Sequence, residues 1–491
     1  MPSSLQSPPL LTPLSREDFQ ELELFLPTLK VISYNGPGLS GGVSKSLEPV
    51  VKRLGTKVHW FAIEGKSLPQ QDEPPEGFSF YSPKIPAHLA ERHRKAAQDY
   101  LWPLLHGLTD KANFDAENWK AFRQVNEIVA SDSLSVSSQS FPTLCWLHDY
   151  QVPLAAPLMS MQAGLIICQF WHVPWPEPEV IVNSPIGKEL VDALLSNKLI
   201  GFHTTEYATN FLNTVKELFP NAQVDVLKME VRRRRSHTRV VVMPLGLDFS
   251  LWQKLARINK PKAEAIGVKH RLANQVILGV DRIDYTKGVL EKLAGIERFL
   301  ETQESWLRRF HYVQVCHAVK YSGAPATEYE TSVLSEIARI NKRFESNGWQ
   351  PILAVNEYLD QNDLAAWYQA ADVLIVNSIK DGLNLIAKEY VACRLDEQGS
   401  LILSKQTGAS AELSQGALLV DPNSPDNIAT AISQALSLEV EEKRRRMNSM
   451  RRVVGWNQLH DWALGFLRQS IQGGRHIAHA NLPIDYTGAL K

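Results

Sequence analysis

Short apolar, often β-branched runs bounded by Gly, Pro, Asn or Asp alternate along the chain with longer segments of helical spacing. In the first half they predict strands at 30–33, 58–63, 143–147, 165–170, 199–202 and 240–243. In the second half they predict strands at 276–280, 312–316, 352–355, 373–376, 401–403 and 417–420. Segments such as 331–344 and 361–370 between them have helical spacing. This alternation predicts parallel sheets with helices on both faces.

The two series of strands are separated by residues 244–250, Pro-Leu-Gly-Leu-Asp-Phe-Ser, which are typical of a linker. We therefore expect two doubly wound α/β domains, at residues 1–248 and 249–455, with residues 1–28 as a flexible, Pro-rich tail. The segment 456–491 begins with a helical pattern and could pack on either domain. Because ligands bind beyond the carboxyl ends of strands in open α/β sheets, we expect the site in the cleft between two such domains.

Composition narrows the class of protein. The 491 residues are 44% hydrophobic and 21% charged, enough to bury a sizeable core in two or three domains. The 52 basic and 53 acidic side chains leave a net charge of -1, so no overall field attracts nucleic acid or an anionic membrane. The four cysteines are scattered without a C-x-x-C pair, which is typical of a reducing compartment and not of a disulfide frame or a zinc site.

Targeting and membrane signals are weak. No positive charge precedes Arg16, and prolines interrupt the first residues, so the start does not resemble a signal peptide. The longest apolar stretch, 154–171, is broken by Pro157 and by polar residues, whereas a membrane span needs about 20 apolar residues. We expect a soluble, cytoplasmic protein with no metal and no cofactor.

The segment 280–288, Val-Asp-Arg-Ile-Asp-Tyr-Thr-Lys-Gly, directly follows a predicted strand. Arg282 offers a bidentate fork and Lys287 a compact charge, so together they could neutralise a diphosphate leaving group. The alternative is a pair of surface cations matched to Asp281 and Asp284, and spacing alone does not separate the two interpretations.

The segment 381–390, Asp-Gly-Leu-Asn-Leu-Ile-Ala-Lys-Glu-Tyr, follows another predicted strand and enters a helix. Free backbone N–H groups at a helix start can receive a phosphate or a sugar hydroxyl. Glu389 lies two turns farther along, roughly 12 Å by helix rise, at a distance suited to a ribose. Taken one at a time, each acid has a simpler interpretation. Asp381 would merely lie near an N-cap, and Glu389 would be a solvated helix residue.

Three weaker signals accompany these motifs. The glycine-rich stretch 36–42 could fold over a phosphate or sugar, or serve as a plain turn. His148-Asp149 and His172 close two strands, where polar side chains meet ligands, although a lone His is more often satisfied locally. The sequence has no H-E-x-x-H, and no Cys/His cluster has zinc spacing, which argues against a zinc enzyme.

The one strongly basic patch is the run Arg232, Arg233, Arg234 and Arg235. Such a run is usually a solvated loop or helix face. A salt-sensitive contact with a polyanion is the alternative, but no interleaved aromatic residues supply base stacking.

Taken together, four motifs resemble those of the trehalose-phosphate synthases, the retaining glycosyltransferases of family 20. They are Ile-Asp-Tyr-Thr-Lys-Gly at 283–288, the segment 381–390, Trp-Leu-His-Asp-Tyr at 146–150 and His-Val-Pro-Trp-Pro at 172–176. They occur in family order, and the resemblance runs from about residue 30 to about residue 465. It implies a GT-B fold of two Rossmann-like domains, with the last helix returning to the first domain.

The resemblance also implies roles for individual residues. Arg282 and Lys287 would hold the donor diphosphate, Glu389 the ribose, His172 the glucose or the transition-state charge, and Asp149 would lie near the acceptor. Phosphates and the transferred glucose would meet one further loop, formed by Asp381, Gly382, Leu383, Asn384 and Leu385. The loop over the donor would contain Gly41 and Gly42.

Departures from the family pattern concern the acceptor. After the first strand the family has Ser-Asn-Arg, with an arginine that binds the acceptor phosphate, but this chain has Asn35-Gly36. His93 replaces the acceptor tyrosine upstream of Trp102, and Lys320 is the best match to a second phosphate-binding arginine. Asn35, His93, Trp102 and Lys320 are thus the predicted acceptor residues.

This pattern is similar to glucosylglycerol-phosphate synthases, cyanobacterial relatives that make a compatible solute for salt tolerance. It implies glucose transfer from ADP-glucose to sn-glycerol 3-phosphate, with ADP resting on the resemblance alone. One alternative is trehalose-6-phosphate synthesis from glucose 6-phosphate. Another, of a different class, is a catalytically silent protein that binds sugar phosphates, or nucleic acid through Arg232 to Arg235.

Overall fold

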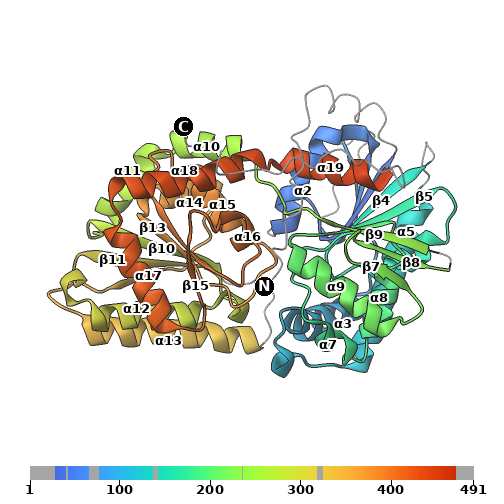
Figure 1. Ribbon diagram of the computed structural model, residues 1–491, viewed down its shortest axis with the longest axis horizontal. Helices are drawn as coiled ribbons and strands as arrows, with labels where there is room; N and C mark the ends of the chain where they lie inside the picture. The colour runs from blue at the N-terminus through green and yellow to red at the C-terminus, as the bar shows by residue number, and fades with distance from the viewer. Residues whose placement is uncertain are drawn as a thin grey trace. The chain divides into compact units, whose positions relative to one another are not determined.

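The computed structural model describes residues 28–39, 42–65, 77–136, 142–234, 236–317 and 324–471 (Figure 1). Two compact units emerge. The first contains the described residues up to Leu245 together with Leu459–Ile471, and the second is Gly246–Gln458. The chain therefore leaves the first unit once and returns to it for the last described helix.

The first unit is built on one sheet, with nine strands among the described residues in the order β3-β2-β1-β4-β5-β6-β9-β8-β7. Neighbours from β3 to β9 are parallel, and the β7, β8 and β9 pairings are antiparallel. The strands are β1 (Leu29–Asn35), β2 (Val58–Glu64), β3 (Ser79–Tyr81), β4 (Thr143–His148), β5 (Leu165–Phe170), β6 (Leu199–Phe202), β7 (Gln223–Asp225), β8 (Glu230–Arg233) and β9 (Ser236–Val242).

Helices connect these strands. They are α2 (Gly42–Leu54), α3 (Ala87–Lys95), η2 (Ala96–Leu101), α4 (Trp102–Leu105), α5 (Ala116–Ser135), α6 (Ala155–Ser160), α7 (Pro178–Val182), α8 (Gly187–Leu194), α9 (Thr205–Leu218) and α19 (Leu459–Ile471), with short 3-10 turns η1 (Gly55–Lys57) and η3 (Thr109–Lys111). In α9, for example, Thr204 caps the first turn by accepting from Tyr207 N at 3.2 Å. Its apolar positions Phe211, Leu212 and Val215 face the core.

The second unit has a parallel sheet in the order β12-β11-β10-β13-β14-β15. Its strands are β10 (Gln275–Arg282), β11 (Phe310–His317), β12 (Ile352–Val355), β13 (Val373–Val376), β14 (Ser400–Ser404) and β15 (Leu418–Val420). Its helices are α10 (Phe249–Ile258), α11 (Lys260–Lys269), η4 (Tyr285–Lys287), α12 (Val289–Thr302), η5 (Glu304–Trp306), α13 (Ala324–Phe344), α14 (Gln361–Ala370), α15 (Leu385–Cys393), α16 (Ser410–Leu413), α17 (Pro425–Ser437) and α18 (Val440–Trp456).

In both sheets the first strand of the unit lies between its second and its fourth strand. The strand order therefore reverses at a switch point. In the second unit this point falls between β10 and β13, and in the first unit between β1 and β4. Doubly wound folds place their ligands beyond the carboxyl ends of the strands at this point. Loops that follow these strands are therefore the places to look for a site.

The predicted α/β class and every predicted strand are confirmed. For β5, β6, β12 and β13 even the bounds coincide with the prediction. Three short strands were missed, β3, β7 and β8, because each is an edge or hairpin strand of three or four residues with few buried side chains. The arginine run was interpreted as a loop or helix face, but its described part lies on β8 and the turn into β9.

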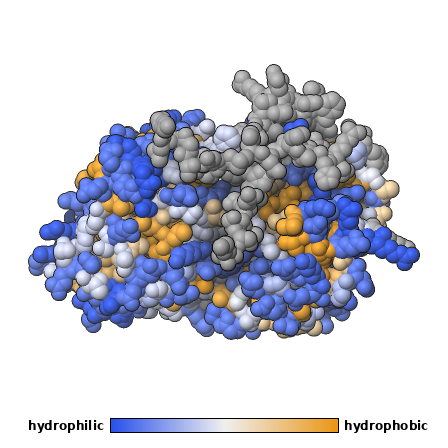
Figure 2. Space-filling model, viewed as in Figure 1, coloured by the Kyte–Doolittle hydropathy of each residue, from blue (hydrophilic) through white to orange (hydrophobic). Residues whose placement is uncertain are grey.

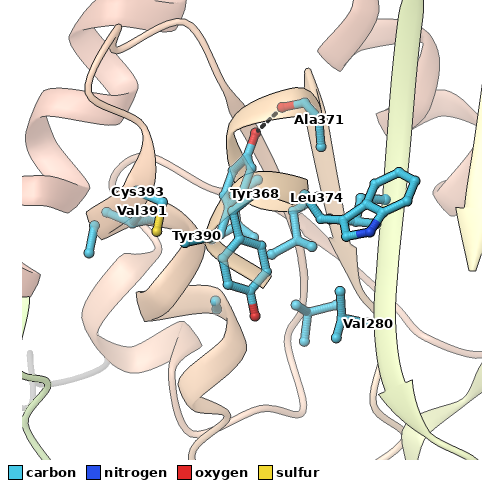
Figure 3. Packing of buried hydrophobic residues seen from close by; sticks show 14 of the residues in the cluster. Val280, Tyr368, Ala371, Leu374, Tyr390, Val391 and Cys393 are labelled. Carbon is cyan, nitrogen blue, oxygen red and sulfur yellow. Dashed lines mark hydrogen bonds between the residues drawn. The ribbon is translucent and has the colours of Figure 1, made fainter. Parts of the chain in front are cut away.

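Cores fill the space between sheet and helices in each unit. In the second unit, Val280, Leu374, Tyr368 and Tyr390 belong to one buried cluster (Figure 3). Tyr390 Oη donates to the carbonyl of Ala371 at 3.3 Å, which satisfies the buried hydroxyl. This packing fixes β10, β13, α14 and α15 against each other. Of these, β10 and β13 precede the two motifs and α15 contains the end of the second motif.

Hydrophilic side chains predominate on the face shown in Figure 2, with apolar patches between them. The large exposed apolar side chains Leu227, Met161 and Val268 come from separate elements or loops. Within the described residues no helix combines the length and the apolar character that crossing a membrane requires.

The last described helix, α19, completes the first unit. Trp462 of α19 packs against Trp146 of β4 and Phe170 of β5, with ring centroids 5.5 and 4.8 Å apart. Phe466 also contacts both of these rings. The final helix thus covers the strands whose carboxyl ends bear the histidines described below.

Candidate active site

Two sequence motifs meet at the switch point of the second unit. The segment 280–288 spans the end of β10 and η4, and the segment 381–390 follows β13 and enters α15. Their loops are joined directly, because Ile379 N donates to the carbonyl of Thr286 at 2.8 Å. The structure thus brings together residues that are about a hundred positions apart in the sequence.

Lys287 and Asp381 form the central contact between these loops. Nζ of Lys287 lies 2.6 Å from Oδ2 of Asp381, and each side chain is less than one-sixth exposed. The same oxygen accepts from Ser378 Oγ and from Asn384 Nδ2, both at 3.1 Å. Asp381 therefore fixes the position of the ammonium group while its own charge is shared among three donors.

The local sequence explains why Lys287 is presented here. Asp284 caps η4 by accepting from Thr286 N and Thr286 Oγ1, both at 2.9 Å. Gly288 then adopts a left-handed conformation with φ 61°, and a Cβ at this position would lie 2.3 Å from the carbonyl oxygen of Asn377. Glycine is required at this position for both reasons.

Arg282 is the last residue of β10, and its side chain is 48% exposed. Its Nη2 lies 3.6 Å from Oδ2 of Asp284, a loose ion pair that leaves the guanidinium accessible. Of the alternative in which Asp281 and Asp284 match the two cations, the contact with Asp284 is present, whereas Asp281 is buried and contacts Lys292 instead. At this strand end Arg282 is thus paired with Asp284, and Lys287 with Asp381.

Asn384 is the N-cap of α15, and its Oδ1 accepts from Ala387 N at 3.2 Å. It has φ 84°, an unusual conformation for a residue other than glycine, and such strain tends to occur at functional positions. The carbonyl of Leu383 accepts from Ala409 N at 2.8 Å. A Cβ on Gly408 would lie 2.0 Å from the carbonyl oxygen of Gly382, so this neighbouring loop packs closely on the segment 381–385.

Glu389 is held in place by Tyr368, whose Oη donates to Oε2 at 2.8 Å. Tyr368 is fully buried, and burial raises its pKa well above the usual range, so it stays a donor. Glu389 is partly exposed. It is thus not a freely solvated helix residue, and its carboxylate is oriented from the α14 side.

Sequence reasoning missed two buried lysines that support the motifs. Lys292 of α12 is fully buried and paired with Asp281, which also accepts from Gln314 Nε2 at 3.1 Å. Lys388 of α15 is 1% exposed, with Nζ 2.6 Å from Oε2 of Glu412. The available signal was periodicity, because both lysines occupy positions that continue the apolar face of a helix.

In the first unit, β4 and β5 present three polar residues at adjacent carboxyl ends. Asp149 follows β4 with φ 69°, and its Oδ1 accepts from His172 N at 3.2 Å. Burial raises the pKa of the Asp149 carboxyl to about 7, against the lowering effect of backbone N–H groups that donate to it. A carboxyl with this pKa can exist in either protonation state near neutral pH.

His148 and His172 lie side by side, with Nδ1 of His148 3.1 Å from Nε2 of His172. Burial lowers the pKa of His172 to about 3, and burial together with the neighbouring His172 lowers the pKa of His148 well below its usual value. Both imidazoles are therefore neutral at physiological pH. The sequence placed each at a strand end but did not reveal that they touch.

The predicted acceptor residues have different surroundings. Asn35 ends β1 and is partly exposed, and Trp102 begins α4, with its ring near those of His106 and Tyr150. His93 is fully buried and stacks between Tyr34 and Phe122. An imidazole in that position belongs to the core, so this placement does not support an acceptor contact for His93.

The remaining predicted residues complete the account. Gly42 begins α2, whereas Gly41 and Lys320 lie outside the described residues. Arg232 contacts Glu230, and Arg233 contacts Asp192, so described members of the arginine run have acidic neighbours. Arg234 lies in the turn after β8, and Arg235 is outside the described residues.

A model of glycosyltransferase family 20 matches residues 38–471 of the chain. The chain belongs to this family. It is 31% identical over 455 residues to an alpha,alpha-trehalose-phosphate synthase [UDP-forming] of Yarrowia lipolytica, covering 88% of this chain and 93% of that protein. It is also 34% identical over 370 residues to a bifunctional trehalose-6-phosphate synthase/phosphatase of Thermoproteus tenax, covering 75% of this chain but 50% of that longer protein.

Solved structures show the same architecture. An alpha,alpha-trehalose-phosphate synthase (UDP-forming) from Burkholderia xenovorans, solved in complex with glucose-6-phosphate, superposes with a TM-score of 0.83 at 26% identity. The match covers 90% of this chain and 99% of that chain. The predicted GT-B fold of two Rossmann-like domains is confirmed, and the family 20 chain is a glycosyltransferase.

Proposed function

We propose that the chain is a retaining glucosyltransferase that moves glucose from a nucleoside diphosphate glucose to glucose 6-phosphate and so forms trehalose 6-phosphate. The observation that carries the donor half is the contact between Lys287 and Asp381, which joins the two motifs at the switch point of the second unit. The acceptor half is supported by relatives that are named trehalose-phosphate synthases and that this chain matches over most of their length.

The donor end of the reaction follows from the charges at β10 and α15. When the bond between glucose C1 and the diphosphate oxygen breaks, negative charge develops on the diphosphate. Arg282 and Lys287 stabilise that charge, and the first N–H groups of α15 add the positive end of the helix dipole. Glu389, already oriented by Tyr368, accepts hydrogen bonds from the ribose hydroxyls.

Retention needs no carboxylate nucleophile in this proposal. The acceptor hydroxyl attacks C1 from the face that the diphosphate leaves, the new C1–O bond forms, and the hydroxyl proton passes to an oxygen of the departing diphosphate. The positively charged sugar intermediate is short-lived, so the fixed cations act by holding the leaving group. His172 and Asp149 of the first unit would contact the glucose and the acceptor.

Glycerol 3-phosphate, with ADP-glucose as donor, is the second candidate. The sequence Asn35-Gly36 replaces the arginine expected after the first strand, and His93 is buried where an acceptor tyrosine was expected. A smaller acceptor needs fewer hydroxyl contacts, so losses at this end of the site favour it. Lys320 is the proposed cation for either acceptor phosphate.

The experiment is a two-by-two assay of the purified chain with UDP-glucose or ADP-glucose and with either acceptor. We expect release of nucleoside diphosphate only when an acceptor is present, and NMR of the product identifies it and its anomeric configuration. Preferred use of glucose 6-phosphate supports the proposal, and preferred use of glycerol 3-phosphate replaces it with the second candidate. An inverted product would refute retention.

The silent binding protein is tested in the same samples. If none of the four combinations yields product while nucleotide sugar still binds, the chain is a binding protein. A contact of the arginine run with a polyanion would appear as inhibition by added DNA that disappears as salt rises. Activity that is indifferent to DNA at low salt argues against that contact.

A further inference from the structure

The last residue of β4 and the residue after it hold His172 at two points. Asp149 accepts a hydrogen bond from the backbone N–H of His172 at 3.2 Å. His148 contacts the imidazole itself, with 3.1 Å between Nδ1 of His148 and Nε2 of His172. Their rings are stacked, with centroids 5.4 Å apart and an interplanar angle of 20°. Main chain and side chain of His172 are therefore both fixed from β4.

Among the described residues, the opposite edge of His148 has no polar partner. Nε2 of His148 is buried and makes no hydrogen bond to the described residues. The ring of Trp146 lies 4.3 Å away, and α19 covers this end of β4 with Trp462. Because buried N–H groups without an acceptor are rare, whereas bare acceptors are better tolerated, the proton of neutral His148 belongs on Nδ1.

This placement of the proton determines the state of the neighbouring ring. If Nδ1 of His148 donates, Nε2 of His172 must accept and carry no proton. Neutral His172 then bears its proton on Nδ1. Nδ1 of His172 is therefore a hydrogen-bond donor, while its Nε2 is an acceptor. His172 is partly exposed, whereas His148 is completely buried, so only the former can present its ring to a ligand.

We propose that His148 is a positioning residue that fixes His172 in the tautomer protonated on Nδ1, so that His172 offers a neutral N–H to a sugar hydroxyl and does not act as a base. The contact with sugar rests on the proposed function, whereas the tautomer does not. A neutral donor binds a hydroxyl of the glucosyl group without placing a positive charge beside a sugar that itself becomes positively charged. Three further rings, those of Phe170, Trp462 and His203, lie near His172. The centroid of the His203 ring is 5.3 Å from that of His172, and Nδ1 of His203 accepts from Leu245 N.

The first test is nitrogen NMR of the full chain labelled with ¹⁵N in histidine, with the His172 signals assigned by comparison with His172→Gln. Protonated and bare ring nitrogens have well-separated shifts. We expect a protonated Nδ1 and a bare Nε2 on His172. A spectrum with the proton on Nε2 of His172, or with a doubly protonated ring at neutral pH, would overturn the proposal whatever the protein catalyses.

The second test removes the donor of His148. In His148→Phe the aromatic packing is retained but Nδ1–H is lost, whereas in His148→Asn the amide N–H lies the same number of bonds from Cα. We expect the His172 tautomer to become mixed in His148→Phe and kcat to fall on the order of 10-fold or more, with a smaller change in KM. The asparagine variant should restore the tautomer and most of kcat.

His270→Phe, at the end of α11, is the matched control for removing a histidine. An unchanged His172 tautomer in His148→Phe would refute the positioning role. If His148→Phe does not fold, the His172 tautomer in wild type and in His148→Asn decides whether His148 has the positioning role. Should wild type show the expected tautomer but transfer no sugar to any acceptor, the proposed function fails and the tautomer assignment stands.

Discussion

Lys287 and Asp381 are 94 positions apart in the sequence, yet their Nζ and Oδ2 atoms lie 2.6 Å apart at the switch point of the second unit. Ser378 and Asn384 donate to the same carboxylate oxygen. This arrangement resembles a preorganised cation site, because the ammonium is oriented before any anion arrives. A bound diphosphate would share Lys287 with Asp381.

We expect Lys287→Met to lower turnover about 100-fold, corresponding to about 3 kcal/mol of transition-state stabilisation from one lost charged contact. Asp381 keeps its two other donors, so the fold should survive. Lys380→Met is the matched control, since Lys380 is a partly exposed lysine adjacent to Asp381 in the sequence. Steady-state kinetics with saturating donor distinguishes them, and equal activity of both variants would exclude Lys287 from the site.

Arg282→Ala should also reduce turnover about 100-fold, because the proposed function places this cation at the leaving group. Its side chain is 48% exposed and its ion pair with Asp284 is long, so the melting temperature should hardly change. Arg282→Lys keeps the charge but loses the bidentate fork, so its turnover should lie between that of wild type and that of Arg282→Ala. Near-normal turnover of the folded alanine variant would remove Arg282 from the mechanism.

The sequence was sufficient for most of the fold because central strands of an α/β sheet are apolar on both faces. Runs such as those of β13 and β14 are buried at every position, so a short apolar run between helical segments identifies them. The strands β7 and β8, at the outer end of the first sheet, have mostly exposed or half-buried side chains and include charged residues. Their pattern does not differ from that of a polar loop, and only the antiparallel pairing of β7 with β8 and of β8 with β9 makes them strands.

The candidate site was predicted only as separate segments. Arg282, Lys287 and Asp381 were found because they follow predicted strands, but nothing in the sequence indicates which ions pair. Lys292 was missed because a lysine among apolar helix positions is usually exposed, and its buried partner Asp281 belongs to another element. His93 was assigned by alignment with a motif, and only packing between Tyr34 and Phe122 reveals that it is buried.

The buried pair of Lys292 and Asp281 should matter for stability. We expect Lys292→Met to lower the free energy of unfolding by about 3–5 kcal/mol, because Asp281 would be left buried without its cation. The double variant Lys292→Met/Asp281→Leu should recover part of the loss, since no unpaired charge remains. Urea denaturation measures both.

The control for this pair is Lys260→Met, which breaks an ion pair with Glu264 that is exposed on both sides. Its effect should stay below about 1 kcal/mol. If Lys292→Met is as mild as Lys260→Met, the buried pair does not stabilise the second unit.

Asp149 should make stability depend on pH in an unusual direction. Burial raises its pKa from 3.8 to about 7, so between these values the folded chain binds a proton that the unfolded chain has released. The free energy of unfolding gained from this group is present below about pH 4 and is lost as pH rises towards 7. Buried histidines with lowered pKa, such as His93, act in the opposite direction over part of this range.

Comparison with Asp149→Asn isolates the carboxyl, because the histidine contributions are common to both proteins. We expect the asparagine variant to become steadily more stable relative to wild type from pH 4 to pH 7, and the difference to be constant above that. Urea denaturation at a series of pH values measures it, with the exposed Asp110→Asn as a control that should show no such trend. A difference that is level across this range would mean that Asp149 is ionised throughout, and that the backbone N–H groups donating to it outweigh its burial.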